Sequence, residues 1–204
     1  MKQRQIDFFF KTLDRQWQKP AEIILLGAAA GSLMGNVRPS LDIDFEIRTR
    51  RQKDPEIRKM LEDAIRAASQ VTGVAVNYSG NVAGWSRIAF LDYRRKALAY
   101  KKIGKLTIKI MRPEYWTLGK MARFLELDIQ DMIKIIKAKK LTPGVLTDIW
   151  ARAVCASDLS LELGQFRDHI VYFIRKYGKQ VWGRQADLEN IVWRFKKKAG
   201  LKHF

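Results

Sequence analysis

The sequence predicts an α+β protein in which a small mixed β-sheet core carries a helical C-terminal half. Up to about Arg112, short apolar runs rich in β-formers alternate with helical patterns. After Pro113, apolar residues recur with a helical period, and no repeat or low-complexity linker interrupts them. We therefore expect residues 1–112 to form the α/β core and residues 113–204 to form a helical region.

Short β-rich or alternating segments supply the strands of the expected core. The first follows the N-terminal segment and ends in a glycine, and the second, LDIDFEI, alternates apolar and polar residues with a period of two. This period predicts that Leu41, Ile43 and Phe45 face the core. The expected strands occupy residues 22–27, 41–47, 74–78, 86–93 and 105–111.

Residues 54–73 carry the helix signals of the core. Asp54 can cap the first turn, Pro55 suits the first helical position, and Glu56 is favourable near the positive end of the helix dipole. Gly73 is placed to end the helix. The helix is expected to present one apolar face to the sheet.

The C-terminal half reads as a succession of amphipathic helices. Tryptophans at helical spacing are expected in its core, at Trp116, Trp150 and Trp193, whereas Trp85 is expected to be exposed. The expected helices occupy residues 113–127, 128–140, 143–157, 158–178 and 187–200.

The charge balance points to a polyanionic partner. The chain of 204 residues has 39 Lys and Arg against 21 Asp and Glu, a formal net charge of +18. Such an excess favours binding to nucleic acid, nucleotide phosphates or an acidic protein. A solvated basic surface without a specific partner is the alternative that composition leaves open.

Cysteine, histidine and hydropathy usage exclude several other classes. The single Cys155 cannot form an intramolecular disulfide, and with two histidines it leaves no zinc site. The longest apolar run, about residues 23–34, is shorter than the ~20 residues that cross a bilayer. The N-terminus lacks the apolar core and cleavage site of an export signal. We expect a soluble, cytoplasmic protein with no membrane partner.

Asp42 and Asp44 are the strongest chemical signal. On a strand they point to the same face, opposite the apolar residues around them. Adjacent carboxylates repel each other unless a cation joins them, and Mg²⁺, or Mn²⁺, is the cation that suits one or two carboxylates plus phosphate oxygens. Glu46 lies one step further on this face, where it is either a further ligand or, as we expect, a solvated residue at the strand end.

The preceding segment, LLGAAAGS, is suited to phosphate. It can turn from a strand into a helix whose small residues let backbone N–H groups approach an anion. Small residues after a strand can also serve packing alone. The Asp-x-Asp pair begins ten residues after Ser32, and this spacing makes the phosphate interpretation more specific.

Together these residues resemble the nucleotidyltransferase superfamily related to DNA polymerase beta. The stretch LLGAAAGSLMGNVRPSLDIDFEI is most similar to the branch that contains the abortive-infection type bacterial toxins and their uncharacterised relatives. Gly27 takes the place of the first motif glycine, and Ala28 replaces the second. Arg38 and Ser40 match the motif in spacing, as do the two aspartates. The resemblance implies that the backbone at Gly27 and Ala28, with Arg38 and Ser40, binds the nucleotide.

A second segment, GKMARFLELDIQDMIKII, is similar to a further motif of the same toxins. The resemblance implies that Lys120 holds nucleotide phosphates and that Asp131 supports the site. Leu127 replaces the basic residue that usually precedes Asp128, and Asp128 can instead cap a helix beginning at Ile129.

The sequence departs from the superfamily at the third carboxylate, which usually lies on a neighbouring strand. In the apolar segment LTIKIM, the position where this carboxylate is expected is occupied by Lys109. Asp92 can serve as the third catalytic carboxylate if residues 86–93 form a strand beside the Asp42 strand, but it can equally open the turn before Arg94.

These features predict metal-dependent transfer of a nucleotidyl group from a nucleoside triphosphate to a hydroxyl acceptor. RNA, in particular transfer RNA, is the expected acceptor because of the charge, and the toxin resemblance implies an antitoxin protein as a partner. The alternatives are a catalytically inactive nucleic-acid-binding protein of the same fold, or transfer to a protein or small molecule. The expected RNA contacts are the basic residues near the end of the core, interleaved with tyrosines: Arg94, Arg95, Lys96, Lys101 and Lys102.

Overall fold

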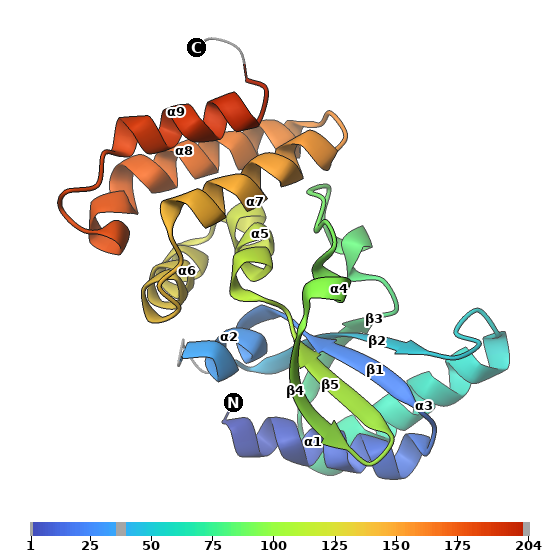
Figure 1. Cartoon of the computed structure of the whole chain (residues 1–204). Helices are drawn as coiled ribbons and strands as arrows, with labels where there is room; N and C mark the ends of the chain where they lie inside the picture. Colours follow the sequence, from blue (N-terminus) through green and yellow to red (C-terminus); the bar gives the residue numbers. More distant parts are fainter. Residues whose placement is uncertain (1, 36–39, 202–204) are drawn as a thin grey trace. The chain divides into compact units, whose positions relative to one another are not determined.

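The chain is an α+β protein with a five-stranded mixed sheet and a helical C-terminal half, as the sequence predicts (Figure 1). The computed structural model describes residues 2–35 and 40–201. The chain forms two compact units. The sheet unit comprises Met1–Val82 and Arg94–Met111, and the helical unit comprises Ala83–Tyr93 and Arg112–Phe204. The chain passes from the sheet unit to the helical unit for the last time after Met111, and residues 83–93 also belong to the helical unit.

The sheet has the strand order β3-β2-β1-β5-β4. β1 pairs antiparallel with β2 and parallel with β5, β2 pairs parallel with β3, and β4 pairs antiparallel with β5. Ile23, Ile24 and Leu25 of β1 are buried, so both faces of this central strand are covered, which explains its apolar sequence. The strands are β1 (Ala21–Leu25), β2 (Asp42–Thr49), β3 (Ala75–Ser79), β4 (Leu98–Ile103) and β5 (Leu106–Ile110).

The strand expected at residues 86–93 is wrong. A short 3₁₀ helix, η1 (Val82–Trp85), precedes this segment, and the short helix α4 (Tyr93–Lys96) ends it. Leu91 has a left-handed backbone with φ 57°, which a strand does not allow. The N–H of Ala89 donates to Ser157 Oγ at 2.9 Å rather than to a neighbouring strand.

The alternation of β2 divides the sheet unit into an apolar and a polar face. Ile43, Phe45 and Ile47 are buried on the face of the sheet along which α1 (Gln3–Trp17) and α3 (Pro55–Thr72) lie, packed against each other (Figure 1). The ring of Phe45 lies 6.0 Å from that of Phe9 and 5.6 Å from that of Phe10. The expectation that Leu41 faces the core is wrong, because β2 begins after it and its side chain is 90% exposed.

Helix α3 has the ends that the sequence predicts. The Asp54 side chain accepts hydrogen bonds from the N–H groups of Glu56 and Ile57, and Pro55 occupies the first turn. Gly73 follows the helix in the left-handed conformation, with φ 66°. These ends fix the length of the helix that covers the apolar face.

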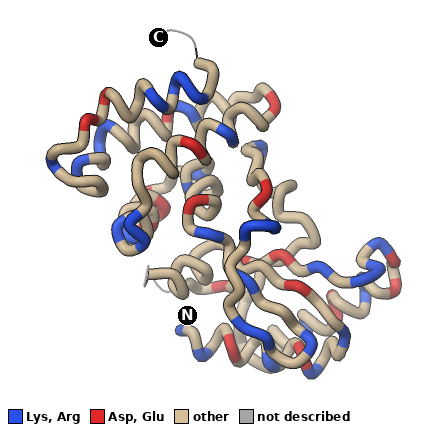
Figure 2. The backbone as a smooth tube through the Cα atoms, in the orientation of Figure 1, with Lys and Arg blue, Asp and Glu red and all other residues tan. Residues whose placement is uncertain are grey.

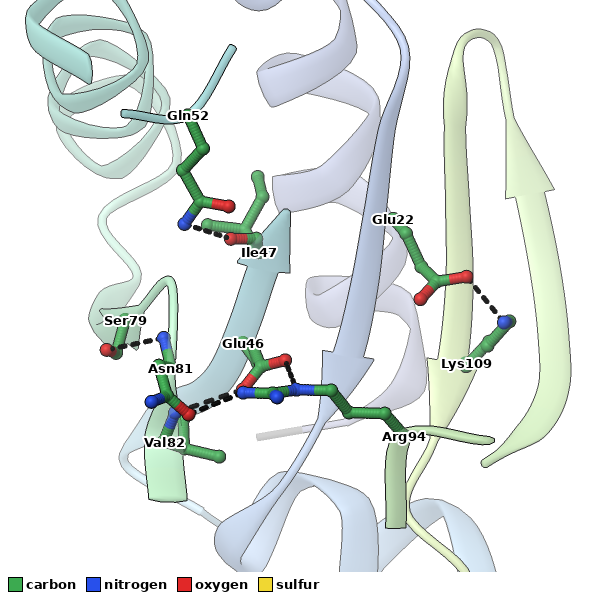
Figure 3. Close-up of polar contacts among 9 residues, drawn as sticks. All are labelled: Glu22, Glu46, Ile47, Gln52, Ser79, Asn81, Val82, Arg94 and Lys109. Atoms are coloured by element: carbon green, nitrogen blue, oxygen red, sulfur yellow. Dashed lines mark hydrogen bonds and ion pairs between the residues drawn. The ribbon is translucent and has the colours of Figure 1, made fainter. Parts of the chain in front are cut away.

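Glu46 is the residue of β2 that departs most from expectation. It is not a solvated strand end: its side chain is fully buried. Arg94 donates from Nε to Oε1 at 2.5 Å and from a terminal nitrogen to Oε2 at 3.0 Å. The N–H of Val82 donates to Oε2 at 3.0 Å (Figure 3). Since the chain leaves the sheet unit after Val82 and returns at Arg94, this carboxylate joins both ends of the excursion.

The helical unit is built on α5 to α9 and on the segment 83–93. Trp150 is fully buried, packs 6.1 Å from the ring of Phe173 and donates from Nε1 to Thr117 Oγ1 at 3.0 Å. Trp116 is buried as expected, whereas the expectation for Trp193 is wrong, because its side chain is 56% exposed. The helices are α5 (Pro113–Arg123), α6 (Glu126–Ala138), α7 (Pro143–Ala156), α8 (Leu161–Trp182) and α9 (Leu188–Lys198).

Trp85 is half-exposed as expected.

In the part of the chain that the structure describes, no helix has the length and apolarity needed to cross a membrane.

The Glu46 contacts predict a large loss of stability when the carboxylate is removed. Replacing Glu46 with Ala leaves the Arg94 guanidinium and the Val82 N–H without their buried acceptor, and breaking such a pair costs about 3–5 kcal/mol. Glu62→Ala is the matched control, since Glu62 forms an exposed i,i+4 pair with Arg58 and such pairs contribute about 0.5 kcal/mol. Urea unfolding followed by circular dichroism measures both. Equal losses in the two variants contradict the role assigned to Glu46.

Candidate functional site

Asp42 and Asp44 form the centre of the candidate site. They lie two residues apart on β2 and are half-buried on its polar face, opposite Ile43 and Phe45. The expectation that both project from one face of a strand is met by this geometry. Two carboxylates so placed need a nearby positive charge or donors.

Asn77 supplies a donor to both carboxylates. It lies on β3, and the parallel register places it directly opposite Asp44. Its side-chain Nδ2 lies 2.7 Å from Asp42 Oδ2 and 3.1 Å from Asp44 Oδ1. One amide group therefore bridges the pair. Sequence reasoning missed Asn77, and the available signal was a polar residue within the β-rich run VAVNY.

Gly27 lies directly against the Asp44 side chain. It is the first residue of α2 (Gly27–Gly35) and has φ 53°. A Cβ at this position would lie 1.7 Å from Asp44 Oδ2. The N–H of Leu26 donates to the Asp44 carbonyl at 2.9 Å, which fixes the strand-to-helix turn beside β2. The N-terminal end of α2, where backbone N–H groups carry partial positive charge, thus adjoins the carboxylate pair.

The other residues of the first motif lie close to this turn. Ala28 and the small residues after it are buried, so α2 packs closely in the sheet unit. Ser40 is buried just before β2, with its Oγ 2.6 Å from the Asp42 carbonyl and 3.2 Å from Asp42 Oδ1. The structure thus brings Gly27, Ala28 and Ser40 together with the aspartates. Arg38 lies outside the described residues.

This donor set fits a magnesium or manganese ion. Asp42 and Asp44 offer two carboxylates that share a face, which are ligands that a hard cation prefers. Asn77 faces both of them with its Nδ2 and so adds no ligand oxygen at this pair. Among the described residues, no three His, Cys, Asp or Glu side chains gather as a ready-made metal cluster. The pair therefore suits an ion that completes its shell with phosphate and water oxygens, as Mg²⁺ does.

Neither Lys109 nor Asp92 lies on a strand that neighbours β2. Lys109 is on β5, which does not neighbour β2, and its Nζ lies 2.5 Å from Glu22 Oε2 (Figure 3). Asp92 lies in the helical unit, where Tyr115 donates to its Oδ1 at 2.7 Å and Arg152 at 3.3 Å. Burial raises the pKa of Tyr115, and the hydrogen bond to Asp92 adds to the rise. The condition that residues 86–93 form a strand beside β2 is not met, and the catalytic role of Asp92 stays a prediction.

Lys120 and Asp131 form an ion pair inside the helical unit. Lys120 Nζ lies 2.8 Å from Asp131 Oδ2 and 2.8 Å from Asp128 Oδ1, and all three side chains are buried. The alternative that Asp128 caps a helix starting at Ile129 is wrong, because α6 begins at Glu126. Burial alone would raise the pKa of Asp128, but hydrogen bonds from Arg123 and Lys120 lower it. These contacts give the motif a structural role, and its nucleotide role stays a prediction.

The basic residues expected to contact RNA divide into two kinds. Arg94 pairs with buried Glu46, so its guanidinium stabilises the fold. Lys101 Nζ lies 2.7 Å from Asp7 Oδ2 on α1. The side chains of Arg95, Lys96 and Lys102 are exposed. Their contacts with RNA stay a prediction.

Comparisons of the chain with protein-family models, with curated proteins and with solved structures give no match. The candidate site therefore depends on the geometry of its own residues.

The contact between Gly27 and Asp44 predicts an unusually sensitive glycine. Ala at this position requires a left-handed backbone, which costs about 1–2 kcal/mol, and its Cβ forces the Asp44 carboxylate away from Asn77. Gly73→Ala is the matched control, since Gly73 has φ 66° and nothing within 4 Å of its added Cβ. We expect Gly27→Ala to cost about 1–3 kcal/mol more than the control, as overpacking does. Urea unfolding measures both, and equal losses contradict the close approach.

Proposed function

We propose that this protein is a metal-dependent nucleotidyltransferase that moves a nucleotidyl group from a nucleoside triphosphate to a hydroxyl acceptor. One observation carries the proposal. The side-by-side carboxylates of Asp42 and Asp44 adjoin the N-terminal end of a small-residue helix, at a glycine that leaves no space for a side chain. A site for a divalent cation and a site for phosphate thus lie next to each other.

The residues of the sheet unit have distinct tasks in this proposal. Asp42 and Asp44 hold Mg²⁺ or Mn²⁺, with Asn77 next to both carboxylates. When bound, the ion neutralises charge on the triphosphate and orients an in-line attack on phosphorus. Gly27 lets the phosphates approach the backbone N–H groups at the start of α2. Ser40 holds the first aspartate in place through its hydroxyl.

Asn77 supports a second interpretation, in which the protein has this fold but no catalytic activity. A neutral amide lies opposite Asp44, on a strand neighbouring the aspartates, where a third carboxylate would strengthen metal binding. A nucleic-acid-binding protein that has the fold without the chemistry is therefore the second candidate function. The two candidates differ in their response to divalent cations.

The acceptor and partners follow from charge and resemblance. We propose RNA as the acceptor because the chain carries a formal net charge of +18. The resemblance to abortive-infection type toxins supports an antitoxin protein as a partner, and it supports nucleotide-binding roles for Arg38, Lys120 and Asp131. Transfer to a protein or small molecule is distinguished from transfer to RNA by the labelled product.

The proposal predicts a metal-dependent gain in stability that requires the aspartate pair. A ligand that binds only the folded state at 100 times its Kd adds about 2.7 kcal/mol, or roughly 5–10 °C in Tm for a chain of this size. We expect this shift with Mg²⁺ and a nucleoside triphosphate, and we expect Asp42→Asn and Asp44→Asn to abolish it together with label transfer. Without metal, both variants should be at least as stable as wild type, because a carboxylate repulsion is relieved.

Asp63→Asn is the control, since it removes the same charge from an exposed position on α3. It should keep the full shift. Absence of both the shift and transfer with any of the four radiolabelled triphosphates contradicts the enzyme proposal and favours the binding protein.

Asn77→Asp tests whether the amide limits metal binding. A third carboxylate should lower stability without metal, because like charges then meet and the bridging donor is lost. It should enlarge the Mn²⁺-dependent rise in Tm relative to wild type, as a stronger cation site requires. Asn77→Ala, which loses the amide without adding charge, should show no such enlargement. A smaller Mn²⁺ response in Asn77→Asp argues against a cation at this pair.

A further inference from the structure

A large basic hollow lies in the sheet unit, at the opposite end of β2 from Asp42. It encloses about 1320 Å³ and is lined by the end of β2, the connection from β2 to α3, the segment after β3, and the starts of β1 and β5. Of the described residues that line it, seven are Lys or Arg and two are Glu. Figure 2 shows several Lys and Arg positions along the connection between β2 and α3. The hollow is therefore strongly cationic.

Some of these cations are neutralised within the fold. Arg51 pairs with Asp54 at 2.5 Å, and Arg58 pairs with Glu62 at 2.9 Å. Arg94 pairs with Glu46. Ion pairs within the sheet unit thus explain the presence of these three guanidinium groups.

Ion pairs within the sheet unit do not explain three further cations, which are Arg48, Arg50 and Lys53. Their side chains are exposed, and among the described residues none of them makes an ion pair. All three line the hollow within six successive residues of the chain. Three like charges this close repel each other, which favours an anion between them.

The end of β2 and the connection into α3, which carry these three cations, are held by hydrogen bonds. Gln52 Nε2 donates to the Ile47 carbonyl at 3.4 Å (Figure 3). The Gln52 amide also lies against Gly80, where an added Cβ would come within 1.7 Å of Nε2. The N–H of Asp54 donates to the Arg51 carbonyl at 2.8 Å and closes the turn into α3. The three charges thus lie on a strand end and a connection whose backbone is hydrogen-bonded.

We propose that this hollow binds the sugar–phosphate backbone of a single-stranded polynucleotide. Its volume exceeds the roughly 300–1,000 Å³ of small-molecule sites, and several unpaired cations along a groove suit consecutive phosphates. Arg48 lies on the same strand as Asp44, four residues further along, which is about 13 Å at 3.3 Å per residue. The polynucleotide is the acceptor of the reaction, and this assignment rests on the proposed function.

The test measures binding without metal or triphosphate, so that a failure of nucleotidyl transfer does not affect it. Fluorescence anisotropy of the full chain in EDTA uses a labelled 12-nucleotide RNA, a DNA of the same sequence and a polyglutamate peptide. We expect the triple variant Arg48→Gln, Arg50→Gln, Lys53→Gln to bind the polynucleotides at least tenfold more weakly. The slope of log affinity against log salt should become shallower by about 2, or about 0.7 for each lost phosphate contact.

The matched control removes three exposed lysines from the C-terminal part of α6 and its C-cap, in the variant Lys134→Gln, Lys137→Gln, Lys139→Gln. It has the same change in net charge and should bind within twofold of wild type. Equal loss in the two triple variants, or polyglutamate binding as tight as RNA binding, overturns the proposal. Tighter binding of RNA than of DNA identifies RNA as the source of the backbone, and the reverse identifies DNA. If the triple variant has a lower Tm, the single variant Arg50→Gln gives the same comparison at an exposed position.

Discussion

Burial of the Glu46 carboxylate constrains the sheet unit more than any other single interaction described. A buried charge is tolerated when it is paired and fully hydrogen-bonded. Glu46 meets this condition with the Val82 N–H and the Arg94 guanidinium, which come from the two points where the chain leaves and re-enters the unit. The same contacts therefore hold β2 in the sheet and bring together Val82 and Arg94, the two ends of the segment that leaves the sheet unit. The candidate site depends on it, because Asp42 and Asp44 lie on the same strand.

The three carboxylates on the polar face of β2 have different surroundings. Glu46 is fully buried and neutralised by a cation, whereas Asp42 and Asp44 are half-buried and share a neutral amide donor. Such a donor offsets repulsion without cancelling charge. The two carboxylates that share this neutral donor thus lie at the end of β2 that adjoins Gly27, where a cation and phosphates are proposed to bind.

Local patterns predicted much of this protein because they act over a few residues. Capping and dipole preferences were sufficient for the ends of α3, and the two-residue period placed Asp42 and Asp44 on one face. The pattern also contained α1, since Ile6, Phe9, Phe10, Leu13 and Trp17 share a helical face, although it was not assigned. Such signals need no knowledge of the rest of the chain.

Features that depend on distant partners were not predictable in this way. The role of Asn77 follows from the parallel register of β3 beside β2, which no local pattern specifies. The burial of Glu46 depends on an arginine 48 residues later in the chain. Residues 86–93 look like a strand because they are apolar, but their apolar side chains belong to the helical unit. The edge strand β4 carries lysines, as edge strands often do to prevent further pairing, and so reads as a solvated basic segment.

The path of the chain between the units limits how the protein can be divided. The chain crosses from one unit to the other after Val82, after Tyr93 and after Met111. A fragment that starts at residue 112 therefore lacks part of the helical unit, including the acceptors that Asp92 provides for Tyr115 and Arg152. A fragment that ends at residue 111 carries eleven residues whose packing partners are missing. Neither unit can be inherited, exchanged or expressed as a simple half of the chain, so any rearrangement of this architecture must keep both.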